Sequence, residues 1–327
     1  MCKASVSRQE IIDCLGADWD RVLALIRDQL HSDVGLLAET NSRILSNSGK
    51  MLRPMMALLI ARAIAAPNND AVCCAAASEL LHNATLIHDD VADESVERRG
   101  RPTLSALLGP GPAVLVGDYW LARAVSLIVD TGHRDPVIRA FAKTLTDLAE
   151  GEMLQLEKAA SCDTVEEDYL RIIHCKTASL FRAAAESAAL SVEADPARLE
   201  AACTYGSALG IAFQIKDDIL DYAGSETLGK PVGVDLREQK ITLPLLEALK
   251  GSPQEADIRA LVREIPSHPE HCDTIRRFVA ERGGVEKAAR RLSEWVERAV
   301  RALDAFEDGP ARDFLAEIAR YNQIRQV

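Results

Sequence analysis

The sequence is poor in the residues that build sheets and turns. Aromatic residues make up 4% of its 327 positions, and there are only 18 glycines and 13 prolines. A sheet protein of this length would need more aromatic and β-branched side chains and more turn residues. The alternation of apolar and polar residues that is typical of half-buried strands is also not evident. A protein built mainly of β-sheet is therefore not expected.

Basic residues and long apolar runs are also scarce. Fifty Asp and Glu residues outnumber 38 Lys and Arg residues, and the formal net charge is −12. A non-specific nucleic-acid binder needs a basic surface, so we expect no nucleic-acid partner. No uninterrupted apolar run of about 18 residues occurs, and the charged N-terminus lacks the apolar core of a signal peptide. We therefore expect no membrane span and a cytoplasmic location.

Metal-binding cysteine pairs and nucleotide-binding glycine motifs are missing as well. The eight cysteines form no CxxC pair and have no regular spacing. This pattern argues against a zinc site and a disulfide framework, and we expect reduced thiols, mostly buried. The sequence contains neither GxxxxGK[ST] nor GxGxxG, so a nucleotide is not expected to be the phosphate donor.

Helix-forming residues are abundant. Hydrophobic residues make up 48% of the chain, and Ala, Leu, Glu and Arg dominate, which favours helices. Apolar residues recur every three or four positions from about residue 8 to residue 322. Turn residues interrupt this pattern at a few places, and the longest irregular segment runs from Gly224 to Pro244. No linker is evident, so we predict an all-α fold with a single domain over residues 1–327.

Two aspartate clusters are the strongest chemical signal. LIHDDVAD supplies Asp89, Asp90 and Asp93, and QIKDDILD supplies Asp217, Asp218 and Asp221. On a helix, the first and last aspartate of each cluster lie on one face, where their like charges repel unless a cation neutralises them. Carboxylate sites without His or Cys favour Mg²⁺. A solvated acidic face is the alternative, but the apolar flanks LLHNATLI and GIAFQI argue against it.

Several basic residues suit anionic ligands. Each taken alone is more often a surface charge, or a core histidine in the case of His82. Together with the aspartates, they suit a polyphosphate held between metal ions and cationic side chains. These residues are Lys50, Arg53, His82, Arg98, Arg99, Lys176, Lys230 and Lys240.

The motifs in this order resemble those of the trans-isoprenyl diphosphate synthases, especially the long-chain polyprenyl enzymes. The resemblance extends from about residue 40 to the end. It rests on GKMLRP, LLHNATLIHDDVADESVERRGRPT, GDYWLARA, GEMLQLE, YLRIIHCKTASLF, GIAFQIKDDILDY and GKPVGVDLREQKITLPLLEAL. It implies a bundle of mostly antiparallel helices around a deep central cavity, and a homodimer.

The resemblance also implies a role for each matching residue. Both aspartate clusters would hold about two to three Mg²⁺ ions on the allylic diphosphate substrate. The matching contacts to that diphosphate are Arg98, Lys176, Lys230 and Lys240. The matching contacts to isopentenyl diphosphate are Lys50, Arg53, His82 and Arg99. Lys176, Thr177 and Gln214 would surround the reacting carbon, and the Gly224–Pro244 loop would act as a lid that excludes water.

The same resemblance implies a reaction. The allylic diphosphate ionises to an allylic cation, the double bond of isopentenyl diphosphate adds to it, and a proton is lost, with the departing diphosphate as its acceptor. Ala84, five residues before the first aspartate cluster, and Thr85 leave the product tunnel open where an aromatic side chain would block it. A twenty-residue helix spans about 30 Å, room for roughly six to eight isoprene units.

We therefore expect a product in the hexaprenyl to decaprenyl range, released through a transient membrane contact. Phe141 or Leu145 would form the tunnel floor, with ordinary core packing as the alternative. Three other functions stay open: a farnesyl or geranylgeranyl diphosphate synthase, a subunit of a heteromeric synthase, and a class I terpene cyclase. A non-catalytic subunit would lack one motif, and a cyclase would not need GKxxR. The C-terminal RYNQIRQV is assigned no role.

Overall fold

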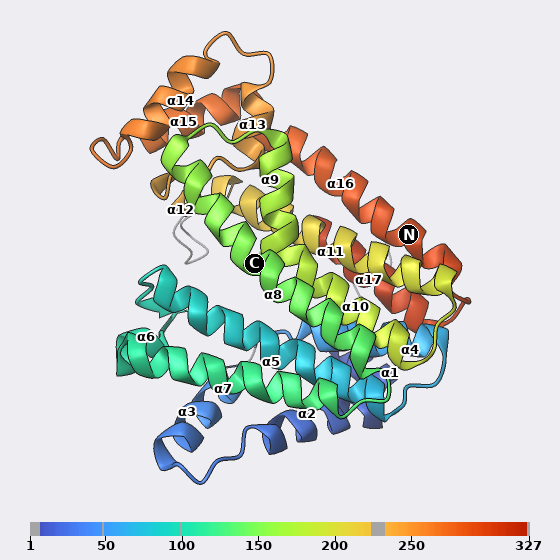
Figure 1. Cartoon of the computed structure of the whole chain (residues 1–327). Coiled ribbons are helices and arrows are strands. Elements are labelled where there is room, and N and C mark those ends of the chain that lie inside the picture. Colours follow the sequence, from blue (N-terminus) through green and yellow to red (C-terminus); the bar gives the residue numbers. More distant parts are fainter. Residues whose placement is uncertain (1–6, 48, 99, 224–232, 326–327) are drawn as a thin grey trace. The chain divides into compact units, whose positions relative to one another are not determined.

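The protein is almost entirely helical over the residues that the computed structural model describes, which are 7–47, 49–98, 100–223 and 233–325. The predicted all-α fold is confirmed, and Figure 1 labels most of its helices. The α-helices are α1 (Arg8–Leu15), α2 (Ala17–Gln29), α3 (Gly35–Ser46), α4 (Leu52–Ile64), α5 (Asn69–Ala92), α6 (Leu104–Leu108), α7 (Pro110–Val129), α8 (Arg134–Ser161), α9 (Glu166–Ile173), α10 (Ser179–Ser191), α11 (Pro196–Ala223), α12 (Val234–Arg237), α13 (Leu243–Leu249), α14 (Glu255–Glu264), α15 (His271–Glu281), α16 (Gly284–Ala302) and α17 (Pro310–Ile324). A π-helical turn, η1 (His174–Ala178), joins α9 to α10, and a 3₁₀ turn, η3 (Leu303–Ala305), follows α16.

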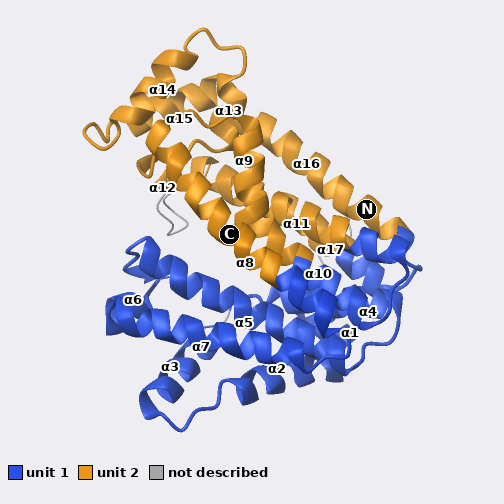
Figure 2. Cartoon of the chain, in the orientation of Figure 1, with its two compact units in different colours: residues 1–141, 183–202, 305–315 blue, residues 142–182, 203–304, 316–327 orange. Residues whose placement is uncertain are grey.

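The chain forms two compact units, each built from three stretches of sequence (Figure 2). Unit 1 contains residues 1–141, 183–202 and 305–315, and unit 2 contains residues 142–182, 203–304 and 316–327. The boundaries fall inside α8, α10, α11, η3 and α17. Each unit is described by itself below, and the single domain expected from the sequence stays a prediction.

Helix α5 is the core of unit 1. Every residue from Ala71 to Leu81 is buried, and most of them are small. Small side chains let neighbouring helices come close, and α5 packs on α7, α4 and α2. The helix begins where the Asn68 side chain accepts a hydrogen bond of 2.9 Å from the backbone N–H of Ala71. This burial fixes the helix whose last turn carries the first aspartate cluster.

Helix α7 is anchored by a buried polar contact. The indole N–H of Trp120 donates to Oδ1 of Asn41 at 2.8 Å, and Asn41 Nδ2 donates to the carbonyl of Leu30 at 2.8 Å. Among the described residues, α7 alone is long and apolar enough to cross a membrane by length and composition, with a mean hydropathy of 1.4. No such segment was expected, since the sequence has no uninterrupted apolar run of about 18 residues. Helix α7 packs on α5, 39% of its apolar window is buried, and a single helix of this kind is weak evidence of a membrane span.

In unit 2, two glycines let long helices approach the π-helical turn η1. A Cβ atom on Gly151 of α8 would lie 2.6 Å from Cβ of Cys175, and one on Gly210 of α11 would lie 2.5 Å from Cα of Ala178. Only glycine fits at such distances. The sequence predicts a helix here but not its π turn, which is a feature found frequently at functional sites.

The remaining helices of unit 2 form a second cluster. Helix α13 packs on α15 and α16, and α14 packs on α15. All seven residues of α13 are buried. The seven cysteines that the structure describes are all free, and six of them are buried, as expected for reduced thiols.

Candidate active site

The first aspartate cluster closes α5. The helix ends at Ala92, and the backbone N–H of Asp93 donates to the carbonyl of Asp89 at 2.8 Å. Asp89 is half-buried, Asp93 is exposed and Asp90 is 7% exposed. The cluster therefore lies on the end of a helix, as predicted, with its middle carboxylate turned inward.

A short hairpin places Arg98 against this cluster. Strands β1 (Glu97–Arg98) and β2 (Arg101–Pro102) pair in an antiparallel register that the sequence analysis did not expect. Arg98 Nε donates to Oδ1 of Asp90 at 2.6 Å. Burial raises the pKa of Asp90, and the hydrogen bond and charge of Arg98 oppose that rise. Arg98, a predicted diphosphate contact, thus touches the first cluster, while Arg99 lies outside the described residues.

The predicted isopentenyl diphosphate contacts Lys50 and Arg53 flank the start of α4. Met51, between them, caps the helix in a left-handed conformation (φ 51°, ψ 45°), which is uncommon for a residue with a side chain. Lys50 is exposed, and Arg53 is half-buried. Arg101 of the hairpin donates a hydrogen bond to the side chain of Asn47 just before this turn. Unit 1 therefore brings the GKMLRP turn and the arginine hairpin together.

The other predicted contacts of unit 1 lie on α5 and α8. His82 is half-buried two turns before Asp89, and Thr85 Oγ1 donates to its carbonyl at 2.9 Å. Ala84 and Phe141 are buried, at 1% and 2% exposed. Leu145, in unit 2, is half-buried. Their roles in isopentenyl diphosphate binding and product length stay predictions.

Unit 2 contains a pocket of about 150 Å³ lined by residues of α8, α9, η1, α11, α12 and the segment before α13. Four of its lining residues were predicted as site residues, namely Lys176, Gln214, Asp218 and Lys240. The lining also includes Gln155, Lys158, Tyr169 and Asp235. The pocket thus combines the buried Asp218 and the half-buried Asp235 with three lysines.

A chain of hydrogen bonds runs along one side of this pocket. Thr177 Oγ1 donates to Oε1 of Gln214 at 2.8 Å, and Gln214 Nε2 donates to Oδ1 of Asp218 at 2.9 Å. The hydroxyl of Tyr169 donates to the other oxygen of Asp218 at 2.6 Å. Asp218 is 3% exposed, and its burial raises its pKa well above the ordinary value. The predicted pair Thr177 and Gln214 is therefore in direct contact and held by the second aspartate cluster.

A further carboxylate, Asp235, joins this cluster. Backbone N–H groups of Val234 and Asp235 donate to the carboxylate of Asp221 at 3.0 and 3.2 Å. Burial, followed by the charge of Asp221, raises the pKa of Asp235 to about 7, while Lys240 and Lys176 oppose the rise. Carboxylates buried this close to one another are destabilising unless protons or a cation neutralise them. Their oxygen-only donor set fits a hard cation such as Mg²⁺.

Each lysine of the pocket is also paired with an acidic side chain. Lys176 Nζ lies 2.6 Å from Glu152 and donates to Gln155 at 3.1 Å. Lys158 lies 3.0 Å from Asp168, and Lys240 pairs with Glu238. Lys230 and residues 224–232 of the predicted lid lie outside the described residues, whereas residues 233–244 of it are described and include α12. These ion pairs hold the ammonium groups in place around the pocket.

The C-terminal helix supplies an arginine to the second aspartate cluster. Arg325 Nη2 lies 2.8 Å from Oδ1 of Asp217 and donates to the carbonyl of Phe213 at 2.8 Å. Its guanidinium carbon also lies 4.1 Å from the centroid of the Phe213 ring. Arg325 is 5% exposed. The tail that was assigned no role therefore contacts a predicted metal ligand.

Sequence reasoning did not select Tyr169, Asp235 and Arg325. Tyr169 precedes Lys176 by seven residues, about two helical turns, which is a signal that it shares a face with that lysine. Asp235 belongs to the GKPVGVD motif and could have been selected by its charge. Nothing near Arg325 in the sequence points to Asp217, 108 positions earlier.

Comparisons with known proteins show the family to which the chain belongs. A family model described as polyprenyl synthetase matches residues 34–279. The chain is 39% identical to octaprenyl diphosphate synthase of Escherichia coli over 313 residues, which cover 95% of this chain and 97% of that protein. A crystal structure of a decaprenyl diphosphate synthase from Rhodobacter capsulatus has a TM-score of 0.91 and 37% identity, covering 98% of this chain and all of that one. A polyprenyl synthase from Caulobacter crescentus, complexed with calcium and isoprenyl diphosphate, has a TM-score of 0.89 and 36% identity, covering 99% and 100%. The chain therefore belongs to the polyprenyl synthetase family.

Proposed function

We propose that this chain is a trans-prenyltransferase that condenses isopentenyl diphosphate with an allylic diphosphate, head to tail. Its product is a long-chain all-trans polyprenyl diphosphate. The observation that carries this proposal is the unit 2 pocket, where Asp218, Asp235 and three lysines line one cavity with Gln214, the hydrogen-bond partner of Thr177. Carboxylates suit metal ions, lysines suit phosphate oxygens, and the neutral pair suits a carbocation. Family membership and the long-chain relatives support the same reaction.

Both aspartate clusters are proposed to hold Mg²⁺, and the acidic group of buried Asp218 and half-buried Asp221 and Asp235 supports that choice of ion. Bound Mg²⁺ would neutralise charge on the diphosphate and make it a better leaving group. The proposal assigns Asp89 and Asp93, with the second cluster, to the allylic diphosphate. A calcium ion is named in the related Caulobacter crescentus structure.

The protein's own groups have three tasks in this proposal. Lys176, Lys240 and Arg98 bind the allylic diphosphate and stabilise the negative charge that develops as it departs. The oxygens of Thr177 and Gln214 orient their dipoles toward the allylic cation without attacking it. Tyr169 and Asp218 keep Gln214 in that orientation through the contacts described above.

A second set of residues is proposed to hold the other substrate. Lys50, Arg53, His82 and Arg99 bind isopentenyl diphosphate, whose double bond adds to the cation. The proton lost after the addition is proposed to go to the departed diphosphate. The hydrogen bond between Arg101 and Asn47, which joins the arginine hairpin to the GKMLRP turn, supports this assignment.

The enzyme is further proposed to be a cytoplasmic homodimer that releases its product through a transient membrane contact. Exposed apolar side chains on the adjacent helices α6 and α7 support the proposed contacts with a second subunit and with a membrane. They are Leu107, Val114 and Leu115, at 41%, 38% and 69% exposed. The small, buried Ala84 supports a long product, since it leaves space where an aromatic residue would fill it.

Product analysis tests this function. The purified chain is incubated with Mg²⁺, an allylic primer and labelled isopentenyl diphosphate, and the products are separated by chromatography. Products in the hexaprenyl to decaprenyl range are expected. Products that stop at farnesyl or geranylgeranyl diphosphate would make it a short-chain synthase. Turnover without isopentenyl diphosphate would make it a cyclase, and activity only with a second protein would make it a subunit.

A further inference from the structure

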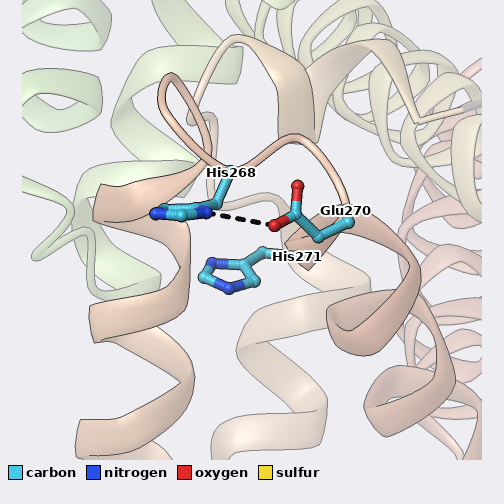
Figure 3. Close-up of side chains that lie close together, drawn as sticks. All are labelled: His268, Glu270 and His271. Atoms are coloured by element: carbon cyan, nitrogen blue, oxygen red, sulfur yellow. Dashed lines mark hydrogen bonds and ion pairs between the residues drawn. The ribbon is translucent and has the colours of Figure 1, made fainter.

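Two histidines and a glutamate gather on the loop between α14 and α15, apart from the residues assigned to prenyl transfer. Figure 3 shows Glu270 beside the ring of His268, with the ring of His271 stacked against that of His268. One donor atom from each residue lies within 4.8 Å of the other two. His268 Nδ1 lies 3.0 Å from Oε1 of Glu270, and the two imidazole rings stack with centroids 5.2 Å apart. We propose that these three side chains form a binding site for a divalent transition-metal ion.

The spacing and the chemistry of these donors select the class of metal. Zn²⁺ binds nitrogen and oxygen ligands at about 2.0–2.2 Å, which places tetrahedral ligands about 3.3–3.6 Å apart. Donors already within 4.8 Å of one another need only small side-chain rotations to reach that spacing. Two imidazoles with one carboxylate favour Zn²⁺, Co²⁺, Ni²⁺ or Cu²⁺ over Mg²⁺. The site therefore takes a different class of ion from the aspartate clusters.

The backbone of this loop holds the donors in place. The N–H of His268 donates to the carbonyl of Glu264 at 2.8 Å, and the N–H of His271 donates to the carbonyl of His268 at 3.0 Å. Pro269 fixes its own φ angle between the two histidines. Ile265 and Cys272, on either side, are 2% and 8% exposed and anchor the loop in unit 2. A metal ion would thus meet a largely ordered set of ligands.

The side chain of a fourth residue, Glu264, lies beside His271. Oε2 of Glu264 lies 3.6 Å from Nδ1 of His271, and that nitrogen is shielded from solvent and has no hydrogen-bond partner. A carboxylate beside a ligating imidazole orients the ring and increases its basicity. The start of α15 disfavours a cation, but Glu264, Glu270 and Asp273 supply negative charge that offsets this effect.

Metal binding here would hold the end of the α14–α15 loop against the start of α15. Because His268 and Glu270 lie in this loop and His271 is the first residue of α15, the ion would stabilise the loop and the start of the helix by mass action. The remaining coordination positions face solvent, since His268 and Glu270 are exposed, and water would fill them. The expected result is a single reversible site that raises the thermal stability of the protein.

Titration of the full chain with metal ions tests the site. The protein is first treated with EDTA, and excess Mg²⁺ is then added to occupy the aspartate clusters. Calorimetric titration with Zn²⁺ is expected to show one equivalent bound, and Co²⁺ is expected to give the absorption bands of a nitrogen-ligated ion. His268→Ala and His271→Ala are each expected to weaken Zn²⁺ binding at least tenfold, an effect of about 1.4 kcal/mol.

His133→Ala is the matched control. His133 also lies beside two carboxylates, Asp70 and Glu193, each at 3.8 Å, but it has a single imidazole. This variant is expected to bind Zn²⁺ as the unmodified protein does. Circular dichroism checks that all three variants fold. Zn²⁺ binding that survives both loop substitutions in folded protein, or no binding by the unmodified chain, would refute the site.

Discussion

The side chain of Tyr169 shows how a single residue can set the geometry of a reacting centre. Its hydroxyl donates to Asp218, and Asp218 in turn accepts from Gln214, which holds Thr177. Tyr169 can affect the reaction without touching a substrate, because it orients the Asp218 carboxylate, which in turn orients the Gln214 amide. The sequence could identify Thr177 and Gln214 through their motifs, but the link to Tyr169 depends on how α9 and α11 pack.

Tyr169→Phe is expected to lower kcat about tenfold, since a loss of about 1.4 kcal/mol in transition-state stabilisation has that effect. The KM for isopentenyl diphosphate should stay unchanged, because no role in binding that substrate is assigned to Tyr169. Steady-state kinetics measure both constants. Tyr205→Phe, which removes the hydroxyl of another buried tyrosine on α11, serves as the control. Equal losses in the two variants would contradict this role.

Asp235 makes the stability of the metal-free protein depend on pH. Its pKa in the folded protein is raised to about 7 from the ordinary 3.8. The unfolded chain therefore releases this proton at a lower pH than the folded protein does. As a result, the free energy of unfolding decreases as the pH rises from about 4 to about 7. Asp235→Asn, which resembles the protonated acid, should remove this contribution.

Thermal unfolding of both proteins between pH 5 and pH 7.5 in EDTA checks this expectation. The melting temperature of the unmodified protein should fall, relative to Asp235→Asn, as the pH rises. Added Mg²⁺ should reduce the difference, because a cation can replace the proton. A constant difference across this range would show that Asp235 ionises at an ordinary pH.

Arg325 competes with any cation for Asp217. Their ion pair is partly exposed on the aspartate side, where the carboxylate is 40% exposed. Pairs of that kind contribute about 0.2–1 kcal/mol. Arg325→Ala should therefore lower the Mg²⁺ concentration needed for half-maximal activity by about two- to fivefold.

Activity measured as a function of Mg²⁺ concentration checks this prediction. Arg320→Ala is the control, because Arg320 lies on α17, which ends just before Arg325, but pairs with Glu317. A higher Mg²⁺ requirement in Arg325→Ala would mean that the arginine orients Asp217 rather than competing for it.

At the scale of the element, the sequence predicted which segments are helices, and where they begin, better than it predicted which helices pack together. Pro110 and Pro196 begin α7 and α11, where turn residues predicted breaks. The spacing of apolar residues could not predict the π turn η1. The spacing in such a turn differs from that in an α-helix by a single residue. The hairpin at Arg98 was missed because each of its strands has only two residues.

Gly210→Ala tests how closely α11 must approach the π turn. The added Cβ would lie 2.5 Å from Cα of Ala178, so the backbone has to move. We expect a loss of about 1–3 kcal/mol in the free energy of unfolding. Activity should also fall because Thr177 is next to Ala178.

Chemical denaturation and steady-state kinetics measure the two effects of Gly210→Ala. Gly111→Ala is the matched control, since Gly111 lies in a helix and has open space at its Cβ position. That variant should keep full activity and stability. Full activity in Gly210→Ala would show that the close approach does not position the reacting residues.

At the scale of the whole molecule, the sequence predicted the fold class, the family and a long-chain product from its motifs. Ala84 is the residue on which the last prediction depends, and it is buried in α5. Ala84→Phe is expected to shorten the product to about three or four isoprene units, because a side chain of that size would block growth. Product chromatography measures the length, and Ala84→Ser is the control.

An unchanged product length in a folded, active Ala84→Phe enzyme would remove this residue as the control point. Motifs could select residues for the proposed reaction centre but not for the distant end of the proposed tunnel. Core side chains such as Phe141 and Leu145 carry no distinguishing pattern, since ordinary packing selects the same residue types.

The direction of the hydrogen bonds between Thr177, Gln214 and Asp218 has a chemical consequence. Thr177 uses its only hydroxyl hydrogen to donate a hydrogen bond to Gln214. The Gln214 amide and the Tyr169 hydroxyl both donate hydrogen bonds to Asp218. The free face of the threonine oxygen therefore offers lone pairs but no acidic hydrogen. An alkene next to it would meet a base-like surface that cannot protonate it. Such an environment is compatible with a carbocation formed by loss of a leaving group. It disfavours a cyclisation that begins with protonation of an alkene.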